Sequence, residues 1–380
     1  MIILQCAVGS WETDCIVALA INAGSSRGMG SGAVSRNVLT AFAATGQEDI
    51  VAMVPKSWNL PAINNRVRLI LVAPGTTHKV IAETVSFRGA FPTHGVNRLF
   101  SLTDTSMPFC PVPHLLLVQQ AYLTYRPSEW GFQASRWWAL RFRAMDAYFR
   151  LGLRSVTLFT VQTHTMKARL ADRWNIDLSR IEVVPSSITP APRDLAWDPQ
   201  AEGDPYVFFP AHGNPHKNHV VLADMLGFLS RRKVNIRCRV TISEDESPRF
   251  ARRATELSVL DRIDFLGRLP PSRVWEVMAG SLALVNPSKL ESFPLTYQEA
   301  MTLGCPVVAA DKDFSREACG EAAIYCDADD GECFGDAVMS LVESASRRKE
   351  LSELGRARAR ESSRSWPEIA GAYRGILERM

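Results

Sequence analysis

Two glutamates eight positions apart, Glu291 and Glu299, stand in the stretch KLESFPLTYQEAMTLGCPVVA (289–309). The run before them, LALVNPS (282–288), has the pattern of a buried strand, and TYQEAMTLG (296–304) has that of a helix closed by its glycine. Glu291 is therefore expected in a strand-to-helix loop, and Glu299 in the first turns of the helix. The N–H groups at such a helix start, with the dipole behind them, are suited to hold a phosphate or diphosphate.

Carboxylates in these two places suit a nucleotide-sugar. Glu291 in the loop can reach a sugar hydroxyl, and Glu299 within the helix can accept hydrogen bonds from ribose hydroxyls. The alternative is that Glu299 only complements the helix dipole and that Glu291 is solvated. Spacing alone leaves both interpretations open.

A lysine follows a second predicted strand, in YVFFPAHGNPHKNHVVLADML (206–226). The pattern predicts a strand, a Gly-Asn-Pro turn and a helix that starts near Lys217, and a lysine at such a turn can neutralise a diphosphate. The rival interpretation makes His212, His216 and His219 metal ligands. No acidic residue stands near them, which disfavours a metal site, and no metal is expected.

A glycine-rich segment, AINAGSSRGMGSGAVSRNVLTAF (20–42), is expected to form a loop between the first strand and the first helix. Gly28, Gly30 and Gly32 would let the backbone approach a ligand closely. Their spacing is not that of a dinucleotide-binding GxGxxG loop, and no phosphate-binding GK[ST] motif is present. A plain tight turn is an equally good interpretation.

Short apolar runs that alternate with amphipathic segments of helix length must position these residues. This alternation indicates parallel sheets covered by helices, an α/β class of fold. Strands are expected in IVALAI (16–21), DIVAMV (49–54), RVRLILV (66–72), RLFSL (98–102), HLLLV (114–118), TLFTV (157–161), IEVVP (181–185), YVFFP (206–210), IRCRVTI (236–242), IDFLG (263–267), LALVNP (282–287), CPVVAA (305–310) and AAIYC (322–326).

The two series of strands predict two doubly wound domains of similar size, joined by the proline-rich stretch around 189–205. The predicted boundaries are a first domain at 1–190, a linker at 191–204, a second domain at 205–364 and a C-terminal helix at 365–380. Ligands bind at the carboxyl ends of strands in such sheets, so the site is expected in a cleft between two facing domains.

Composition is that of a globular protein, with 46% hydrophobic and 22% charged residues over 380 positions. The longest apolar runs are too short to cross a membrane, and the N-terminus lacks the features of a secretory signal. Eight cysteines without a CxxC pair suggest reduced thiols in the cytoplasm. Cys319, Cys326 and Cys333 are evenly spaced, which we interpret as coincidence because no histidine stands near them.

The net charge of +3 is unevenly distributed. Lys and Arg outnumber Asp and Glu by 19 to 13 over residues 1–199 and are outnumbered by 24 to 27 in the rest. The first half is therefore the one suited to an acidic or membrane-bound partner, whereas a nucleic-acid partner is not expected. Its segment FQASRWWALRFRAMDAYFRLGLR (132–154) predicts a basic amphipathic helix that either rests on a membrane surface or packs its aromatic residues on its own sheet.

Several of these stretches resemble retaining glycosyltransferases of family 4. ESFPLTYQEAMTLGCPVVAAD is similar to the family's EX7E signature with its EAMxxGxPVVA continuation, and PHKN (215–218) looks like its phosphate-binding lysine turn. FLGRLPPSRVWEVMAGSLALVNPS (265–288) resembles the segment before the signature, and SREACGEAAIYCDADD (315–330) the segment after it. The likeness is strong over 206–330 and patchy before that.

The resemblance implies a GT-B fold, with two Rossmann-like domains that bind a nucleotide-sugar donor and a saccharide or lipid-linked acceptor. It implies metal-independent transfer of a sugar such as mannose or rhamnose in bacterial surface polysaccharide or O-antigen synthesis, at the inner face of the cytoplasmic membrane. By the same resemblance Glu291, Lys217 and His212 would be catalytic, Gln119 and Gln120 would lie on the acceptor side, and the donor would be bound by Glu299, Phe293, Leu295, Thr296, Arg268, Ser243 and Gly30.

Three positions depart from the family's pattern. His212 stands where an arginine is common, and either a protonated or a hydrogen-bonding His212 could replace it. Gln119 and Gln120 stand where many members have a histidine, and an amide cannot shuttle a proton. Pro294 stands where a glycine is common and supplies no N–H to a phosphate. Two alternatives therefore stay open: an inactive nucleotide- or glycan-binding scaffold subunit, and a sugar-nucleotide epimerase.

Overall fold

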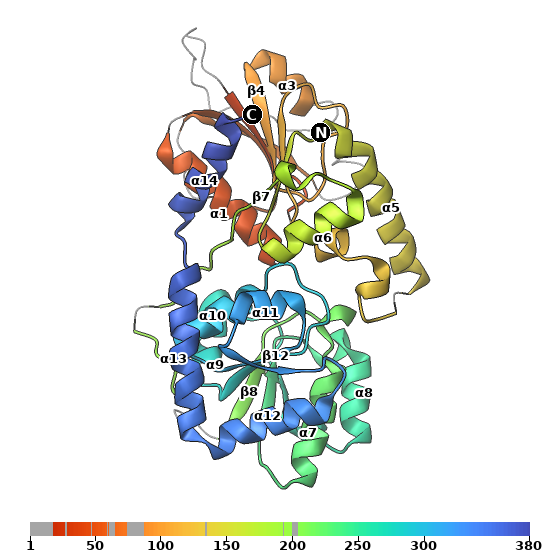
Figure 1. The fold of residues 1–380 in the computed structure, drawn as a ribbon, viewed down its shortest axis with the longest axis vertical. Coiled ribbons are helices and arrows are strands. Elements are labelled where there is room, and N and C mark those ends of the chain that lie inside the picture. The colour runs from red at the N-terminus through yellow and green to blue at the C-terminus, as the bar shows by residue number, and fades with distance from the viewer. Residues whose placement is uncertain are drawn as a thin grey trace. The chain divides into compact units, whose positions relative to one another are not determined.

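The structure, a computed structural model, describes residues 18–26, 29–46, 48–58, 60, 65–73, 87–133, 135–192, 194–199 and 204–380. The chain forms two compact units, each built on one sheet (Figure 1). The first unit takes its described residues from Met1–Arg126, Ala134–Ser187 and Arg364–Met380, and the second from Pro127–Gln133 and Ile188–Ser363.

The sheet of the first unit is parallel and has the strand order β3-β2-β1-β4-β5-β6-β7. Its strands are β1 (Ala18–Asn22), β2 (Asp49–Pro55), β3 (Val67–Val72), β4 (Val96–Ser101), β5 (His114–Leu117), β6 (Leu158–Val161) and β7 (Ile181–Val183). Buried β-branched and leucine side chains fill them, as expected where helices cover both faces. The order of strands reverses between β1 and β4, so this unit is doubly wound.

Six helices of the first unit are described: α1 (Met29–Thr45), α3 (Arg88–Thr93), α4 (Ala121–Thr124), α5 (Arg136–Gly152), α6 (His164–Trp174) and α14 (Trp366–Glu378). The last of these comes from the C-terminus and packs beside α1 (Figure 1). Tyr373 of α14 lies against Phe100 of β4, with ring centroids 4.8 Å apart. Arg98 donates a hydrogen bond to the carbonyl of Leu377 over 3.0 Å, so both apolar and polar contacts attach α14 to this sheet.

The sheet of the second unit is also parallel and has the order β10-β9-β8-β11-β12-β13. Its strands are β8 (Tyr206–Phe209), β9 (Arg237–Val240), β10 (Ile263–Phe265), β11 (Ala283–Asn286), β12 (Val307–Ala310) and β13 (Ala323–Cys326). Every strand expected from the sequence is therefore present, within a few residues at each end. The prediction of two Rossmann-like parallel-sheet domains is confirmed, and the order reverses here between β8 and β11.

Helices of the second unit are α7 (Val220–Arg231), α8 (Pro248–Glu256), α9 (Pro271–Ala279), α10 (Leu295–Leu303), α11 (Asp313–Cys319), α12 (Gly331–Glu343) and α13 (Ala345–Ser362). The predicted stop of α10 is confirmed: Gly304 takes the left-handed conformation with φ of +83°. L side chains rarely adopt this φ, and a Cβ at Gly304 would also lie 2.3 Å from Nε of Arg356, so glycine is strongly favoured at this end of the helix.

The division of the chain lies within three residues of the predicted boundaries at Ser187 and Arg364, and it differs from them more clearly in two other places. Residues 127–133, expected in the first domain, belong to the second unit because Gly131 and Phe132 contact its loops. The described part of the predicted linker is also attached to the second unit, where the indole N–H of Trp197 donates to the carbonyl of Ser281 over 2.8 Å. These attachments are made by tertiary contacts of single side chains, which composition does not indicate.

Candidate functional site

Two loops of the second unit meet at the carboxyl ends of neighbouring strands. One follows β8 and contains a short 3₁₀ turn at Pro215–Lys217; the other follows β11 and leads into α10. Because β8 and β11 are adjacent at the point where the strand order reverses, this is the position at which doubly wound sheets bind ligands. The predicted helix start near Lys217 is wrong by three residues, since α7 begins at Val220.

An ion pair joins the two loops. The ammonium group of Lys217 donates a hydrogen bond to Oε1 of Glu291, and the two side chains are only 19% and 12% exposed. Burial raises the pKa of Glu291, but the positive charge of Lys217 and its hydrogen bond outweigh this effect and hold the pKa below its usual range. Glu291 is therefore ionised at neutral pH, and two residues predicted to be catalytic are in direct contact.

Backbone and side-chain hydrogen bonds fix the same two loops. The N–H of Lys289 donates to the carbonyl of His216 over 2.8 Å. Asn218, next to Lys217, has a positive φ of 58°, which asparagine tolerates better than most residues, and its side chain donates to the carbonyl of Ala328 over 2.6 Å. The turn that carries Lys217 is thus held from two sides.

Residues 127–133 complete this set of contacts. Lys289 donates from Nζ to the carbonyl of Gly131 over 2.9 Å and forms an ion pair with Asp329. The ring of Phe132 lies 6.3 Å from that of His216 and 5.9 Å from that of Trp130. Our reading of the sequence missed this segment, and its only signal was a pair of aromatic residues around a glycine.

Helix α10 begins directly after the loop that carries Glu291. Leu295 and Thr296 are its first two residues, and the structure gives no acceptor for their N–H groups among the described residues. Pro294 takes the N-cap position with an extended ψ of 92° and has no N–H of its own. Phe293 precedes it, so the three predicted amide donors do lie at a helix start with a favourable dipole.

Glu299 lies in the second turn of α10, apart from the Lys217–Glu291 pair. Burial raises the pKa of Glu299 to about 7, although its side chain keeps some solvent exposure. It forms no ion pair with another described residue. Burial thus favours the protonated form of Glu299, which speaks against the alternative that it is an ionised, dipole-stabilising residue.

His212 follows β8 and lies beside several charged groups. Burial lowers the pKa of His212, the charges of Lys217 and Arg268 lower it further, and the charge of Glu246 opposes this shift. The neutral ring of His212 is therefore favoured, and it could replace an arginine by hydrogen bonding, whereas a protonated ring is disfavoured beside Lys217.

The other two histidines of the predicted metal cluster are also neutral. Burial lowers the pKa of His216 to about 4 and that of His219 to about 3. The ring of His219 packs between Phe209 and Phe250, with centroids 4.9 and 5.9 Å away. In the part of the chain that the structure describes, no three His, Cys, Asp or Glu side chains are grouped as a metal site requires.

Arg268 and Ser243 meet at Glu246. Arg268 is 70% exposed and lies 3.5 Å from Oε1 of Glu246. The other carboxylate oxygen, Oε2, accepts hydrogen bonds from the N–H of Ser243 over 3.0 Å and from its hydroxyl. A Cβ on Gly213 would lie 2.4 Å from the carbonyl oxygen of Glu246, so the His212 loop and this group are in close contact.

The glycine-rich segment of the first unit contributes one described candidate residue, Gly30, to the predicted site. Gly30 is the second residue of α1 and not part of a loop, and a Cβ there would meet nothing within 4 Å. The prediction of a glycine loop at Gly30 and Gly32 is therefore wrong, because α1 begins at Met29; Gly28 lies outside the described residues.

Gln119 and Gln120 follow β5 in the first unit. Gln119 is buried, and its side-chain amide donates to the carbonyl of Leu102 over 3.2 Å. The backbone N–H groups of both glutamines donate to Oδ1 of Asp104, which has a positive φ of 60°. The side chain of Gln119 therefore stabilises the first unit. Asp104, which the sequence analysis did not identify, orients the backbone of both glutamines.

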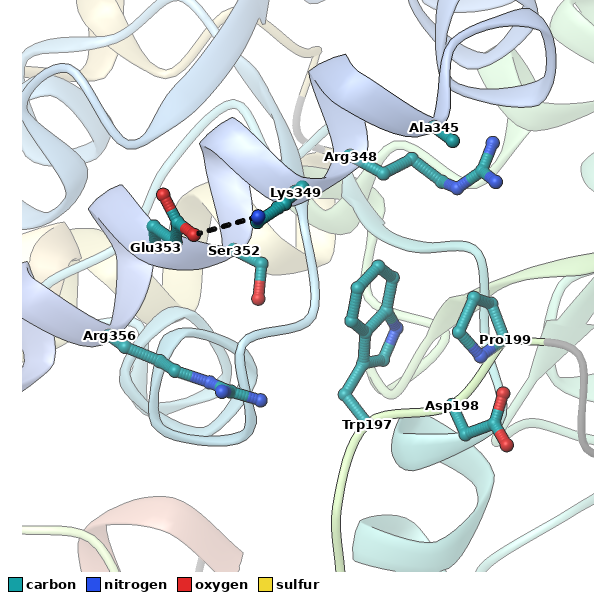
Figure 2. A pocket seen from close by; sticks show the side chains of 9 residues that line it. All are labelled: Trp197, Asp198, Pro199, Ala345, Arg348, Lys349, Ser352, Glu353 and Arg356. Atoms are coloured by element: carbon teal, nitrogen blue, oxygen red, sulfur yellow. Dashed lines mark ion pairs between the residues drawn. The ribbon is translucent and has the colours of Figure 1, made fainter.

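A separate cavity of about 360 Å³ lies at the other end of α10 (Figure 2). Its lining includes Ser352 and Arg356, which pack around Gly304, and the ring of Trp197, which faces side chains of α13. A helix of nine residues is about 13 Å long, so this cavity is distinct from the N-terminal end of α10. None of the predicted site residues lines it.

Residues 194–358, within the second unit, match the family of glycosyl transferases group 1. The D-inositol 3-phosphate glycosyltransferase of Nocardia farcinica is 32% identical over 157 residues, which are 38% of this chain and 35% of that protein. The enzyme of the same name from Gordonia bronchialis is 28% identical over 229 residues, or 55% and 49% of the two chains. The matched part of the chain thus spans between about a third and a half of these relatives.

Solved structures of similar fold cover nearly the whole chain. Sucrose-phosphate synthase from Thermosynechococcus elongatus has a TM-score of 0.74 at 15% identity and covers 96% of this chain and 100% of that one. WaaG, a glycosyltransferase involved in lipopolysaccharide biosynthesis, has a TM-score of 0.69 at 16% identity, with coverages of 95% and 99%. HepE of Anabaena, in complex with UDP and glucose, has a TM-score of 0.69 at 13% identity, with coverages of 96% and 100%. At these identities the likeness shows the fold, which is GT-B.

Proposed function

We propose that this chain is a retaining glycosyltransferase that transfers a sugar from a nucleoside diphosphate-sugar to a hydroxyl group of a saccharide or lipid-linked acceptor. The observation that carries the proposal is the Lys217–Glu291 pair at the point where the strand order of the second unit reverses. The match of residues 194–358 to glycosyl transferases group 1 supports it. The fold alone does not imply this activity, because one fold hosts many activities.

In this proposal the diphosphate takes the place of Glu291 beside Lys217. The N–H groups of Leu295 and Thr296 add hydrogen bonds and the positive end of the α10 dipole. The bond between the sugar's anomeric carbon and the diphosphate oxygen breaks, a bond to the acceptor oxygen forms, and the acceptor's proton leaves to the departing diphosphate. Lys217 stabilises the charge that develops on that diphosphate, and this electrostatic effect replaces a paired acid and base.

Glu291, displaced from Lys217, is free to accept hydrogen bonds from the transferred sugar, and Glu299 to accept them from the ribose. Arg268, Ser243 and the neutral ring of His212 would then border the diphosphate. Gln120 and the backbone near Asp104 are proposed on the acceptor side, in the first unit. This assignment requires no metal, so transfer should persist in the presence of EDTA.

Replacement of Lys217 tests the proposal directly. Lys217→Ala should lower the turnover number by about 10²- to 10³-fold, since it removes one preorganised charge from the leaving group, and Lys217→Arg should keep part of the activity. Lys233→Ala, at an exposed lysine of the same unit, is the control. Full transfer activity in Lys217→Ala would overturn the assignment.

The donor and acceptor can be found by separate screens. A nucleotide that binds the folded chain raises its melting temperature, so UDP, GDP and dTDP should be compared first. UDP is present in a solved structure of similar fold, and D-inositol 3-phosphate is named for two relatives, so both belong in the screens. Mannose and rhamnose donors follow, with surface-polysaccharide precursors as acceptors.

A second candidate is a binding protein without transferase activity. Two observations favour it: Pro294 offers no N–H at the start of α10, and Lys217 already has a carboxylate partner. In that case a nucleotide would raise the melting temperature, but neither transfer nor donor hydrolysis would occur with any donor. Analysis of the products from donor alone would also detect an epimerase.

A further inference from the structure

Helix α5 of the first unit has two unlike faces. Phe142 and Phe149 are buried on the inner face, where their rings lie 4.3 Å from that of Tyr122 and 4.8 Å from that of Trp174. These contacts attach α5 to the rest of its unit, as one interpretation of the sequence predicted. They use only some of the helix's large apolar residues.

The remaining large apolar residues of α5 point to solvent. Trp137, Leu140 and Leu151 are 72%, 59% and 57% exposed, and Ala144 and Ala147 between them are exposed as well. Their spacing of three or four residues places all five on one stripe along the helix. Figure 1 shows α5 along the outside of its unit.

A second exposed aromatic residue lies at the C-terminal end of this stripe. Phe109 is 73% exposed, and its N–H donates to the hydroxyl of Ser155, four residues after Leu151 in sequence, over 2.8 Å. The loop reaches the helix because Gly152 has no side chain: a Cβ there would lie 1.4 Å from the hydroxyl of Ser106. Phe109 also has a positive φ of 55°, which is costly for a bulky residue. Its backbone is thus held in a strained form that displays the ring to solvent.

Arginines line the apolar stripe. Arg136, Arg143 and Arg150 recur every seven residues and are exposed, so they form a row beside the stripe. Arg141 and Arg154 are exposed near it. The acid of this helix, Asp146, pairs with Arg173, whose guanidinium lies 2.6 Å away, and its charge also acts on Arg150, which lies over the ring of Trp174. Among the described residues, no ion pair joins Arg136 or Arg143 to a carboxylate.

We propose that α5 and Phe109 form a docking surface for an anionic lipid bilayer. The apolar stripe would enter the boundary between headgroups and acyl chains, with Trp137 at the depth that tryptophan prefers, while the arginine row pairs with lipid phosphates. A bilayer is favoured over a protein partner because the exposed charges beside the narrow apolar stripe are all arginines, while the acid of the helix, Asp146, pairs with Arg173. If the proposed function holds, docking brings the enzyme to lipid-linked acceptors.

The test is co-sedimentation of the whole chain with vesicles. Vesicles of phosphatidylcholine and phosphatidylglycerol should bind the chain, phosphatidylcholine alone should bind it far more weakly, and added salt should release it. The triple variant Arg136→Gln, Arg143→Gln, Arg150→Gln should lose on the order of a hundredfold in binding, from about fivefold for each charge. The triple variant Trp137→Gln, Leu140→Gln, Leu151→Gln should lose at least about tenfold.

Matched controls separate this surface from general charge or hydrophobicity. Two triple variants at exposed positions elsewhere should bind vesicles as the wild type does: Lys233→Gln, Arg249→Gln, Arg252→Gln, and Leu178→Gln, Val342→Gln, Leu354→Gln. The nucleotide-induced rise in melting temperature and transfer to a soluble acceptor, measured without vesicles, should be unchanged in all four variants. A failure of docking is therefore distinguishable from a failure of the proposed function.

Three results would overturn the proposal. The first is an absence of binding to the anionic vesicles, and the second is wild-type binding by either α5 variant. The third is self-association in solution, measured by sedimentation velocity, that the α5 variants abolish while vesicles bind nothing. That third outcome would identify the stripe as an interface between copies of the chain.

Discussion

Glu299 is a carboxyl group whose protonation is set by burial. Below pH 4.5 it is protonated in both the folded and the unfolded chain. As the pH rises toward 7 the unfolded chain loses this proton while the folded chain keeps it, because the folded pKa is about 7. The free energy of unfolding should therefore fall across this window, by at most about 3 kcal/mol from this group.

The variant Glu299→Gln should lose this contribution to the pH dependence and be more stable than the wild type above pH 7. Urea denaturation at pH 5 and pH 8 measures the free energy of unfolding of both proteins. Glu378→Gln, at an exposed glutamate, should keep the wild-type difference between the two pH values. An identical difference in Glu299→Gln would contradict the placement of this carboxyl in a desolvating environment.

Nucleotide binding should be linked to the same proton. In the proposed role ribose hydroxyls donate to Glu299, which favours its ionised form, so binding should release a proton near pH 6 and weaken as the pH falls. Calorimetry in two buffers of different ionisation enthalpy counts the protons released. Glu299→Gln should bind more weakly and show no such linkage; a nucleotide affinity of the wild type that is equal at pH 6 and pH 8 would argue against contact with the ribose.

At the scale of the helix, Gly304 decides where α10 can end. Its φ of +83° and the 2.3 Å approach of Arg356 to an added Cβ mean that Gly304→Ala is both strained and crowded. We expect a loss of about 2–4 kcal/mol in the free energy of unfolding. Gly371→Ala, in α14, is the matched control: a Cβ there meets nothing within 4 Å, so a gain of about 0.5–1 kcal/mol is expected from helix propensity. Equal effects of the two substitutions would exclude this account.

Residues 127–133 should affect donor affinity, because Phe132 lies against His216 next to Lys217. Phe132→Ala removes a ring contact worth about 0.5–1.5 kcal/mol, which corresponds to a rise of about twofold to twelvefold in the donor's dissociation constant. Phe132→Leu should have a dissociation constant between those of the wild type and Phe132→Ala. Phe109→Ala, in the first unit, should bind nucleotide as the wild type does. An unchanged affinity in Phe132→Ala would mean that the Lys217 turn is positioned by Asn218 and Lys289 alone.

For the whole molecule, the sequence was most informative about strands. Runs such as HLLLV and LALVNP are buried on both faces of a parallel sheet, so their hydrophobicity is continuous and easy to identify. The placement of Glu291 and Lys217 was predictable for a related reason: each lies in the loop that follows a strand, and the two strands are neighbours at the reversal point. Their roles stay a prediction.

Features that depend on tertiary contacts were not predictable. Gly30 lies in a helix because α1 starts at Met29, a start that glycines do not signal. The neutral state of His212 follows from its burial beside Lys217 and Arg268, which lie 5 and 56 positions away. Which aromatic residues of α5 face solvent depends on how the helix is rotated about its axis against its unit. The basic amphipathic pattern is compatible both with packing on the sheet and with an exposed apolar stripe.

The C-terminal helix α14 shows how a distant segment supports the first unit. Tyr373 is 2% exposed and packs on Phe100, so Tyr373→Ala should cost on the order of 3–5 kcal/mol, whereas Tyr373→Phe, which keeps the ring contact, should cost much less. Hydrogen exchange should speed up in peptides of β1, β4 and α1, while peptides of the second unit keep their protection and nucleotide still binds, because that unit has its own core. An equal loss of protection in both units would mean that α14 stabilises the chain as one cooperative whole.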